Sequence, residues 1–594
     1  MLPMPPYLRI KASEGQATPV SDGNDANFWT DLFIRSTPNP FPRSLMNLSN
    51  SEIDPPLTGA YDFTIRRMEK APDGVPRQFL TINGQFPGPL IEANWGDTIQ
   101  VTVHNEIDAP QEGTALHWHG MLQKGTPWMD GVPGIQQCPI APLGTFTYSF
   151  TADLYGTTWY HSHYSGQYAG GLLGPIVIHG PDENTYDIDL GPVLLTDHYH
   201  TDYFDLIEDV VSTNLTKALV KSNNNLIQGR NNFDCNLVSA STPCSSNAGL
   251  TNFQFTAGKS HRLRLINAGA EGIQMFSIDG HTLSVIANDF VPISPYTTQG
   301  KYHINAFPEI SLTAPVVTLG VGQRTDVLVQ GLSGVSGSYL MRSSIAACSN
   351  AQVPHSTAVI YYGSSAPATP PTTTSWPAFD NTVANQCAND PLQSTVPLYP
   401  IKPDPSPPVT QEIDINFGQN TSNFWVWTMN GESFRTDYNS PVLLLSNIGN
   451  NSYPNSPEWN VYDFGSSSSI RIWIKNPGPV AHPMHLHGHN FFVLNVGTGT
   501  WDGSIINAAN PQRRDTQLVP AGGFLILQIT ADNPGAWPLH CHIAWHVSAG
   551  LYITVLERPA DIANLQIPAV MAQTCRDWAT FTGGTVPDQI DSGL

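Results

Sequence analysis

Hydrophobic and polar residues alternate over many short segments of this chain, and turn-forming residues separate the segments. A period of two places one face of a strand on a core and the other in solvent. In the first part of the chain the pattern recurs at residues 63–68, 79–84, 96–105 and 145–152. These segments predict the strands of an all-β unit.

Two further series of alternating segments follow. The second begins near Val193 and includes residues 253–258, 261–269, 275–287 and 324–331. The third includes residues 411–418, 469–476, 490–497 and 523–535. Each series predicts a β-sandwich or a Greek-key barrel. The 594 residues also exceed the roughly 250–300 at which a single core stops growing, so several domains are expected.

Two regions of different composition separate or precede these series. Residues 1–55 are rich in Pro, Ser and Asn and are predicted to form an N-terminal extension. Residues 364–408 are rich in Pro, Ser and Thr and are predicted to be a linker. The three predicted units are therefore residues 56–182, 183–363 and 409–594, the last with a C-terminal tail.

Composition and charge exclude several classes of function. The 49 glycines and 51 prolines favour many turns over long helices. The formal net charge of -22 repels phosphate backbones, so no nucleic-acid partner is expected. There is no run of about 18 apolar residues, so no membrane span is expected. The first 15 residues also lack the apolar segment of a signal peptide.

The cysteines and the glycosylation sequons favour an exported protein. Seven cysteines occur, and the odd number implies that one has a separate task. Sequons stand at Asn47, Asn214, Asn420 and Asn450. Six cysteines that could pair, together with several sequons, predict a secreted, extracellular glycoprotein.

Histidines occur in four pairs with one residue between the partners: His117 and His119, His161 and His163, His485 and His487, and His540 and His542. Side chains two residues apart on a strand share a face, so each pair aims two imidazoles the same way. Imidazole is the most common metal-binding side chain near neutral pH. Two pairs lie in the first unit and two in the third, which predicts a polynuclear metal site between these units.

Cys541 stands between His540 and His542 and therefore points to the opposite face of the strand. With His482 and His546 it would form a His₂Cys set, which is typical of a blue copper site for electron transfer. Leu551 lies ten residues after Cys541, where a thioether could have been an axial ligand. An electron entering at Cys541 could then reach the histidine cluster through adjacent backbone.

Four segments resemble the copper-binding motifs of the multicopper oxidase family, most closely those of laccases from ascomycete fungi. They are HWHG at 117–120, HSHYSGQYAGGLLG at 161–174, HPMHLHGH at 482–489 and HCHIAWHVSAGL at 540–551. The resemblance extends from about Tyr61 to Leu594. It implies three cupredoxin-like domains, four copper ions and the reduction of dioxygen to water.

The resemblance also implies a role for each histidine of the motifs. The implied copper ligands are His482, Cys541 and His546 for the type 1 copper, with Leu551 on its axial side; His117 and His485 for the type 2 copper; His119, His161 and His542 for one type 3 copper; and His163, His487 and His540 for the other. His489 is not a ligand in the family. The histidines that match no ligand position are His104, His179, His198, His200, His261, His281, His303 and His355.

Two carboxylates resemble functional residues of the family. Asp130 resembles the carboxylate that delivers protons near the type 2 copper, although an Asp before Gly131 is also common in turns. Glu271 resembles the carboxylate that hydrogen-bonds a phenol in the substrate pocket, although a solvated loop acid fits equally well.

Further pocket and tail features follow from the same resemblance. His546 would form the pocket floor, and Trp425, Trp427 and Trp545 could form its walls. The final residues, 591–594, resemble a tail that enters the channel to the oxygen site. The implied disulfides are Cys138–Cys575, Cys348–Cys387 and Cys235–Cys244.

The function predicted from these features is that of a laccase, which oxidises phenolic molecules by one electron and reduces dioxygen, acting here as a monomer. An alternative is another multicopper oxidase, such as a ferroxidase or an ascorbate or bilirubin oxidase. A ferroxidase should offer acidic residues beside the type 1 histidines, and only Glu271 is a candidate. A copper protein that only transfers electrons would not need the eight clustered histidines.

Overall fold

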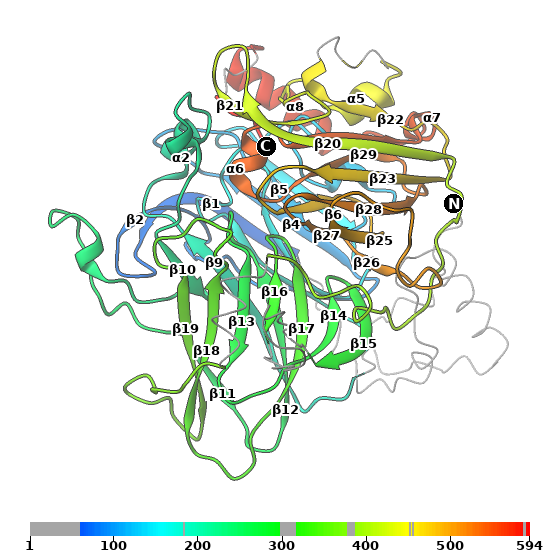
Figure 1. Cartoon of the computed structure of the whole chain (residues 1–594). Coiled ribbons are helices and arrows are strands. Elements are labelled where there is room, and N and C mark those ends of the chain that lie inside the picture. The colour runs from blue at the N-terminus through cyan, green and yellow to red at the C-terminus, as the bar shows by residue number, and fades with distance from the viewer. Residues whose placement is uncertain are drawn as a thin grey trace, which may run out of the picture.

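Three pairs of β-sheets follow one another along the chain, as the computed structural model shows (Figure 1). The structure describes residues 60–181, 184–297, 316–376, 387–450, 453, 457–585 and 590–594. The predicted extension over residues 1–55 lies outside the described residues.

The first pair of sheets has four strands in each sheet. One sheet has the order β2 (Arg77–Ile82), β1 (Ala60–Lys70), β4 (Thr98–Asn105) and β6 (Thr145–Thr151). The other has the order β3 (Ile91–Asn94), β8 (Leu173–His179), β7 (Gly156–Ser162) and β5 (Leu116–Trp118).

The second pair has six strands and five strands. The six-stranded sheet has the order β10 (Asn224–Ile227), β9 (Ile188–His198), β12 (Ser260–Asn267), β17 (Arg324–Gln330), β14 (Ser284–Asn288) and β15 (Val291–Thr297). The five-stranded sheet has the order β11 (Asn252–Phe255), β19 (His355–Tyr362), β18 (Ser338–Ile345), β13 (Gln274–Ile278) and β16 (Val317–Leu319).

The third pair of sheets also has six strands and five strands. The six-stranded sheet has the order β21 (Trp425–Met429), β20 (Val409–Gln419), β23 (Ser469–Asn476), β28 (Gly523–Thr530), β25 (Phe491–Thr498) and β26 (Gln512–Arg514). The five-stranded sheet has the order β22 (Val461–Asp463), β30 (Tyr552–Glu557), β29 (Gly535–Cys541), β24 (His482–Leu486) and β27 (Thr516–Val519).

All three units share one topology. In each unit the first long strand pairs in parallel with a later strand: β1 with β4, β9 with β12, and β20 with β23. A second parallel pair closes the facing sheet of each unit: β3 with β8, β11 with β19, and β22 with β30. The predicted all-β class with three sheet-pair units is confirmed, while the boundaries between the units stay predictions.

The alternation read from the sequence explains how each sheet buries one face. On β4, Ile99, Val101 and Val103 are fully buried, whereas Thr98 before them and Gln100 among them are exposed. Burying one such aliphatic side chain contributes roughly 1.5–3 kcal/mol. Repeated over the strands of both sheets, this burial forms the core between them.

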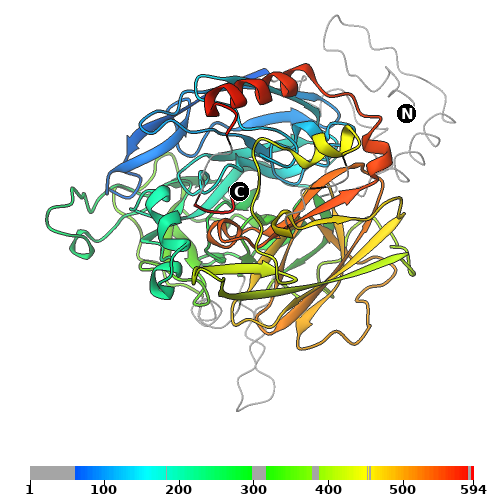
Figure 2. The same cartoon turned by 90° about the horizontal axis from the view of Figure 1, so that it is seen from above.

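Six short helices lie between or after the strands: α2 (Tyr203–Val210), α3 (Leu215–Ala218), α5 (Val442–Asn447), α6 (Ala544–Ser548), α7 (Pro559–Ile562) and α8 (Ala569–Thr582), counted over the described residues. Helix α8, which the sequence analysis did not anticipate, lies across the first unit (Figure 2). No helix among the described residues is both long and apolar enough to cross a membrane.

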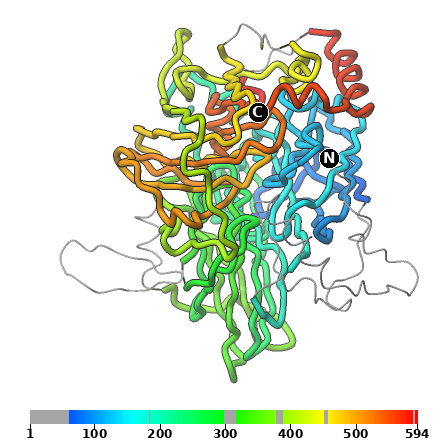
Figure 3. The backbone as a smooth tube through the Cα atoms, turned by 90° about the vertical axis from the view of Figure 1, so that its right-hand side faces the viewer, coloured from blue at the N-terminus to red at the C-terminus, as the bar shows by residue number. Residues whose placement is uncertain are grey.

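The first and third units lie side by side, with the second unit below them (Figure 3). The described part of the predicted linker follows the surface and is tied down by hydrogen bonds. Thr373 Oγ1 donates to Asp279 over 2.6 Å, and Trp376 Nε1 donates to the Ile278 carbonyl over 2.8 Å. Residues 364–376 are therefore packed on the second unit, whereas residues 387–408 form hydrogen bonds with the third unit, as where Leu518 N–H donates to Asn389 over 3.1 Å.

Candidate metal centre

Strand register brings the four histidine pairs together two by two. In the first unit, β5 and β7 are antiparallel, and His117 lies directly opposite His161. In the third unit, β24 and β29 are antiparallel, and His485 lies directly opposite His540. Directly opposed residues have side chains about 4.5–5.5 Å apart at Cβ. Each unit therefore presents one compact group of four imidazoles.

The two groups of imidazoles meet at the interface between the first and third units. The rings of His119 and His485 stack with their centroids 3.9 Å apart, and those of His117 and His487 are also 3.9 Å apart. All eight rings are buried. Three sets of three have ligand atoms within 4.8 Å of one another: His117, His119 and His161; His117, His485 and His487; and His163, His487 and His540.

Hydrogen bonds fix which nitrogen faces the centre in several of the rings. His487 Nδ1 donates to the Asp130 carboxylate over 2.8 Å, and His540 Nδ1 donates to the Cys541 carbonyl over 2.9 Å. Their Nε2 atoms are therefore both lone-pair acceptors, yet they lie only 3.1 Å apart. Two lone pairs at this distance repel unless a cation lies between them. The imidazoles thus fit a metal cluster.

Other rings repeat this arrangement. His117 Nδ1 donates to the Asp130 carbonyl over 2.7 Å, and His485 Nδ1 donates to the Asp515 carbonyl over 2.8 Å. The Nε2 atoms of both rings, and that of His161, are buried without a hydrogen-bond partner. A buried polar atom without a partner is costly, and a bound metal would remove that cost.

Burial also keeps His485, His487 and His540 neutral. It lowers the pKa of His485 and His487 well below the ordinary value, and the neighbouring imidazoles lower it further. Burial likewise lowers the pKa of His540 to about 3. A metal ligand must be deprotonated, so the pocket holds the rings in their binding form.

The opposite face of β29 carries the second site. Cys541 is the one free cysteine of the described residues and is fully buried. Its Sγ lies 3.5 Å from Nδ1 of His482 and 3.5 Å from Nδ1 of His546, and these two nitrogens are 3.2 Å apart. One thiolate and two imidazoles at the corners of such a triangle are the donor set of a blue copper site. Leu551 is buried, and its carbonyl accepts a hydrogen bond from the Cys541 amide over 3.1 Å.

Asp130 contacts histidines from both units. One carboxylate oxygen lies 3.3 Å from His117 Nδ1, and the other accepts from His487 Nδ1 and, over 3.0 Å, from Gln136 Nε2. Burial raises the pKa of Asp130, although His117 opposes the shift. A buried carboxyl with a raised pKa can hold a proton beside the cluster.

Asp515 was missed by the sequence analysis. Its carboxylate accepts from His119 Nε2 over 3.1 Å and forms a two-point ion pair with Arg324 at 2.6 and 2.5 Å. The bond to Nε2 leaves Nδ1 of His119 facing the cluster, 3.1 Å from Nε2 of His542. Asp515 stands outside every histidine motif, and its role appears only where His119 of the first unit, Arg324 of the second and Asp515 of the third meet.

A cavity of about 690 Å³ opens next to His546. Loops of the second and third units, helices α3 and α6, and strands β20 and β21 line it. Among its lining residues only Glu271 is an acid and none is a Lys or Arg. Trp427, Trp545 and His546 line it as expected, and the ring centroids of Trp427 and His546 are 4.5 Å apart.

Trp425 does not line this cavity, and this expectation is corrected. Phe417 of β20 lines the cavity instead and stacks on Trp425, with ring centroids 5.2 Å apart. Trp425 therefore supports a wall residue. Phe417 belongs to an ordinary alternating strand, so its sequence context gives no sign of this role.

Glu271 lies on a loop that Asp197 holds in place. The Asp197 carboxylate accepts three backbone N–H bonds, from Ala270, Glu271 and Gly272, over 2.6–2.8 Å. Burial and the Asp197 charge raise the pKa of Glu271 to about 8. One Glu271 oxygen is buried without a hydrogen-bond partner, so it is free to meet a substrate hydroxyl.

Comparison with known proteins decides the family. Models of the multicopper oxidase family match residues 64–183, 189–300 and 403–561. The chain belongs to the multicopper oxidase family.

Several relatives within the multicopper oxidases are fungal laccases. Laccase-2 of Botryotinia fuckeliana is 36% identical over 558 residues, which cover 91% of this chain and 89% of the relative. Laccase-1 of Melanocarpus albomyces is 35% identical over 577 residues, covering 91% and 86%. The crystal structure of the laccase from Botrytis aclada has a TM-score of 0.79 at 34% identity and covers 90% of this chain and 94% of that chain. The predicted family, cupredoxin-like fold and laccase-type oxidoreductase class are confirmed.

A more distant multicopper oxidase has a different described role. Fet3p, a multicopper oxidase that functions in iron import, has a TM-score of 0.74 at 25% identity and covers 90% and 96% of the two chains. Its similarity supports the shared fold and the lower identity does not favour the ferroxidase alternative.

The three disulfides of this multicopper oxidase join the expected pairs: Cys138–Cys575, Cys235–Cys244 and Cys348–Cys387. The first ties α8 to the first unit. Residues 591–594 are buried, and Leu594 lines a small cavity with His161, His163, His540 and His542. His489 donates from Nδ1 to the His487 carbonyl and from Nε2 to the Glu557 carboxylate, each over 2.9 Å, so both of its ring nitrogens are engaged outside the cluster.

Proposed function

We propose that this multicopper oxidase is a laccase that oxidises four phenolic molecules, one electron each, and reduces one dioxygen to two waters. Four electrons and four protons are needed for each dioxygen. The observation that carries the proposal is the position of Cys541. It completes a thiolate–imidazole triangle with His482 and His546, and its neighbours His540 and His542 belong to the eight-histidine cluster.

The residues present fit four copper ions. The proposed ligands are His482, Cys541 and His546 for type 1; His117 and His485 for type 2; His119, His161 and His542 for one type 3 copper; and His163, His487 and His540 for the other. When bound, the coppers would supply one-electron oxidation at the first site and dioxygen reduction at the cluster. Two peptide neighbours of Cys541 then provide a covalent path between the sites.

The cavity beside His546 suits a neutral aromatic substrate. Trp427 and Phe417 offer aromatic faces, and the prolines Pro477 and Pro479 add apolar walls. His546 is only partly buried, so its ring edge is the side of the thiolate–imidazole triangle that a substrate can reach. Glu271, the one carboxyl among the lining residues, would orient the phenol hydroxyl and, when ionised, accept its proton.

Asp130 is proposed to move protons at the cluster. It contacts a proposed type 2 ligand and a proposed type 3 ligand, and burial raises its pKa. Both features favour a group that gains and loses a proton close to the site of oxygen reduction.

Three disulfides and several sequons support secretion, and the protein is proposed to act as an extracellular monomer. The decisive test of function compares steady-state oxidation of a methoxyphenol with oxidation of Fe(II), each followed by oxygen uptake. Preference for the phenol, with four phenols consumed for each dioxygen, supports the proposal. Preference for iron, or no oxygen uptake by the copper-loaded protein, contradicts it.

A further inference from the structure

A fifth histidine pair with the same spacing lies outside the copper motifs. His198 is the last residue of β9, and His200 follows two positions later. Tyr199, between them, accepts a hydrogen bond from Trp545 Nε1 over 3.0 Å, and Asp197, before them, accepts one from the Glu271 amide over 2.8 Å. The two histidines face the other way, toward Asp73 in the turn between β1 and β2.

The three side chains approach one another closely. His200 Nε2 lies 2.8 Å from one Asp73 oxygen, and His198 Nε2 lies 3.7 Å from the other. The two rings are nearly perpendicular, with centroids 5.4 Å apart. One ligand atom from each residue lies within 4.8 Å of the other two. Ligand atoms about 2.1 Å from a tetrahedral ion are about 3.4 Å apart, so small shifts would complete such a site.

One nitrogen at the centre of this group has no partner. His198 is 2% exposed, and its Nε2 is buried without a hydrogen bond. It faces the carboxylate, yet the 3.7 Å separation is too long for a hydrogen bond. A cation between His198 Nε2 and the Asp73 oxygen would satisfy both atoms.

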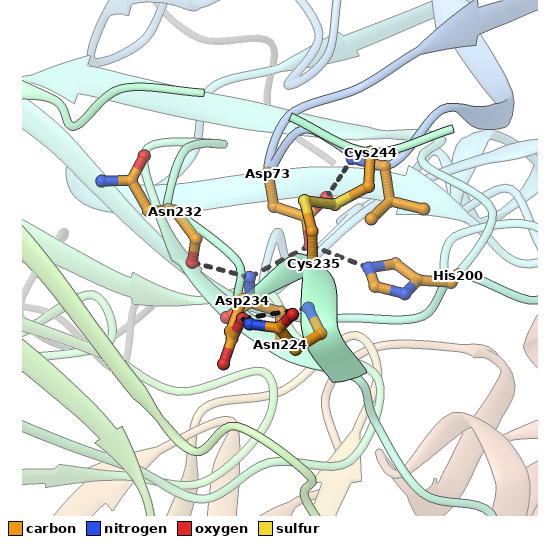
Figure 4. Close-up of a disulfide and its surroundings, with 9 residues drawn as sticks. Asp73, His200, Asn224, Asn232, Asp234, Cys235 and Cys244 are labelled. Carbon is orange, nitrogen blue, oxygen red and sulfur yellow. Dashed lines mark hydrogen bonds and ion pairs between the residues drawn. A yellow bond between two sulfur atoms is a disulfide. The ribbon is translucent and has the colours of Figure 1, made fainter. Parts of the chain in front are cut away.

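Neighbouring groups hold Asp73 in position, as the close-up shows (Figure 4). Val75 N–H donates to one oxygen over 3.1 Å, and Asn224 Nδ2 donates to the other over 3.0 Å. Gly74 has a φ of +97°, and a Cβ there would lie 1.9 Å from the Ser245 carbonyl oxygen. The loop closed by the Cys235–Cys244 disulfide therefore packs directly on this turn. Such outer hydrogen bonds are typical of carboxylates that bind metals.

Other histidine–carboxylate pairs differ from this group. His179 lies 3.2 Å from Glu92, but these two side chains are about 40% exposed, whereas Asp73 and His198 are buried. The Asp73 carboxylate is fully buried, whereas the His200 side chain is 11% exposed. An ion could therefore enter from the His200 side and find a preformed site.

We propose that Asp73, His198 and His200 bind one divalent transition-metal ion, with Zn²⁺ as the reference ion, between the first and second units. Two imidazoles and one carboxylate are the ligands that zinc-class ions prefer, with water in the open position. Calcium is disfavoured because it takes six to eight oxygen ligands. The Arg77 guanidinium lies over the Phe79 ring, which stacks on His198, so its positive charge opposes the binding of a cation.

The test uses the full-length protein with its copper sites filled. The protein is equilibrated with ZnSO₄ and gel-filtered, and zinc and copper per chain are then measured by mass spectrometry. We expect one zinc per chain in the wild type, and at least about tenfold less in H198Q and H200Q. The matched control H179Q, which also removes a histidine paired with a carboxylate, should retain the zinc. Copper content and blue absorption should not change in any variant.

Equal zinc in the wild type, H198Q and H200Q would overturn the proposal. If both variants fail to fold, anomalous scattering at the zinc edge from crystals of the wild type decides instead. A peak among Asp73, His198 and His200 supports the site, and a map without that peak contradicts it.

Discussion

The histidine cluster and the substrate cavity are built in different ways, although His546 and Cys541 join them. The cluster is formed by β5, β7, β24 and β29, whose register sets which imidazoles face one another. The cavity is lined mostly by loops and short helices of the second and third units. Substitutions in the cluster should therefore change metal binding and the rate of dioxygen reduction. Substitutions in the cavity should change which substrates are oxidised.

The largest effect is expected from Cys541→Ser, which removes the thiolate between the two sites. Blue absorption and turnover should fall to background, because the hydroxyl is a poor copper ligand and electrons cannot enter. The eight histidines are untouched, so copper analysis should still find the cluster filled. Blue absorption that survives in the variant contradicts the assignment.

The next largest effect is expected from Asp130→Asn. Turnover should fall by about 10²–10⁴-fold, because the amide cannot hold a proton beside the cluster. Anaerobic reduction of the blue site by a phenol, measured by stopped flow, should stay unchanged. Slower reduction of the blue site would show that Asp130 acts in substrate oxidation, which contradicts the proposed role in dioxygen reduction.

Asp515→Asn should act on metal content. It weakens the hydrogen bond that turns Nδ1 of His119 toward the cluster, and loss of such an outer partner costs about 10–100-fold in metal affinity. Dialysis against a chelator followed by copper analysis measures the loss. The exposed Asp532→Asn serves as a control. Equal copper retention in the two variants removes Asp515 from this role.

Glu271→Gln should act on substrate choice. The kcat/KM for phenols should fall about tenfold or more, in line with loss of a charged hydrogen bond, while a non-phenolic donor is unaffected. The pKa of about 8 means that the carboxylate, the form that accepts the phenol proton, accumulates as the pH rises through 8. The ratio of phenol to non-phenol kcat/KM should therefore rise with pH in the wild type and stay flat in the variant. A parallel rise in both proteins would argue against this role.

The smallest effects distinguish the two aromatic residues at the cavity wall. Phe417→Ala should raise the KM for phenols by about 2–10-fold, the range of one aromatic contact. Trp425→Phe should change it by less than about twofold, because Trp425 only supports Phe417. Steady-state kinetics on one phenol separate the two, and the reverse order would show that Trp425 reaches the substrate.

Sequence patterns predicted the strands and the cluster because both depend on a period of two. The same period placed Cys541 opposite His540 and His542, and the structure has that arrangement. Asp515 and Phe417 could not be predicted, since their roles arise where separate units meet. The group of His198, His200 and Asp73 could not be predicted either. The spacing of the two histidines is visible in the sequence, but only the fold brings Asp73 next to them.

The most direct test of the central claim is metal analysis of the purified protein together with absorption and spin-resonance spectra. The account predicts four coppers per chain: one blue, one spin-resonant without blue colour, and two that are coupled and silent. A metal-replete sample with no more than one copper per chain would contradict it.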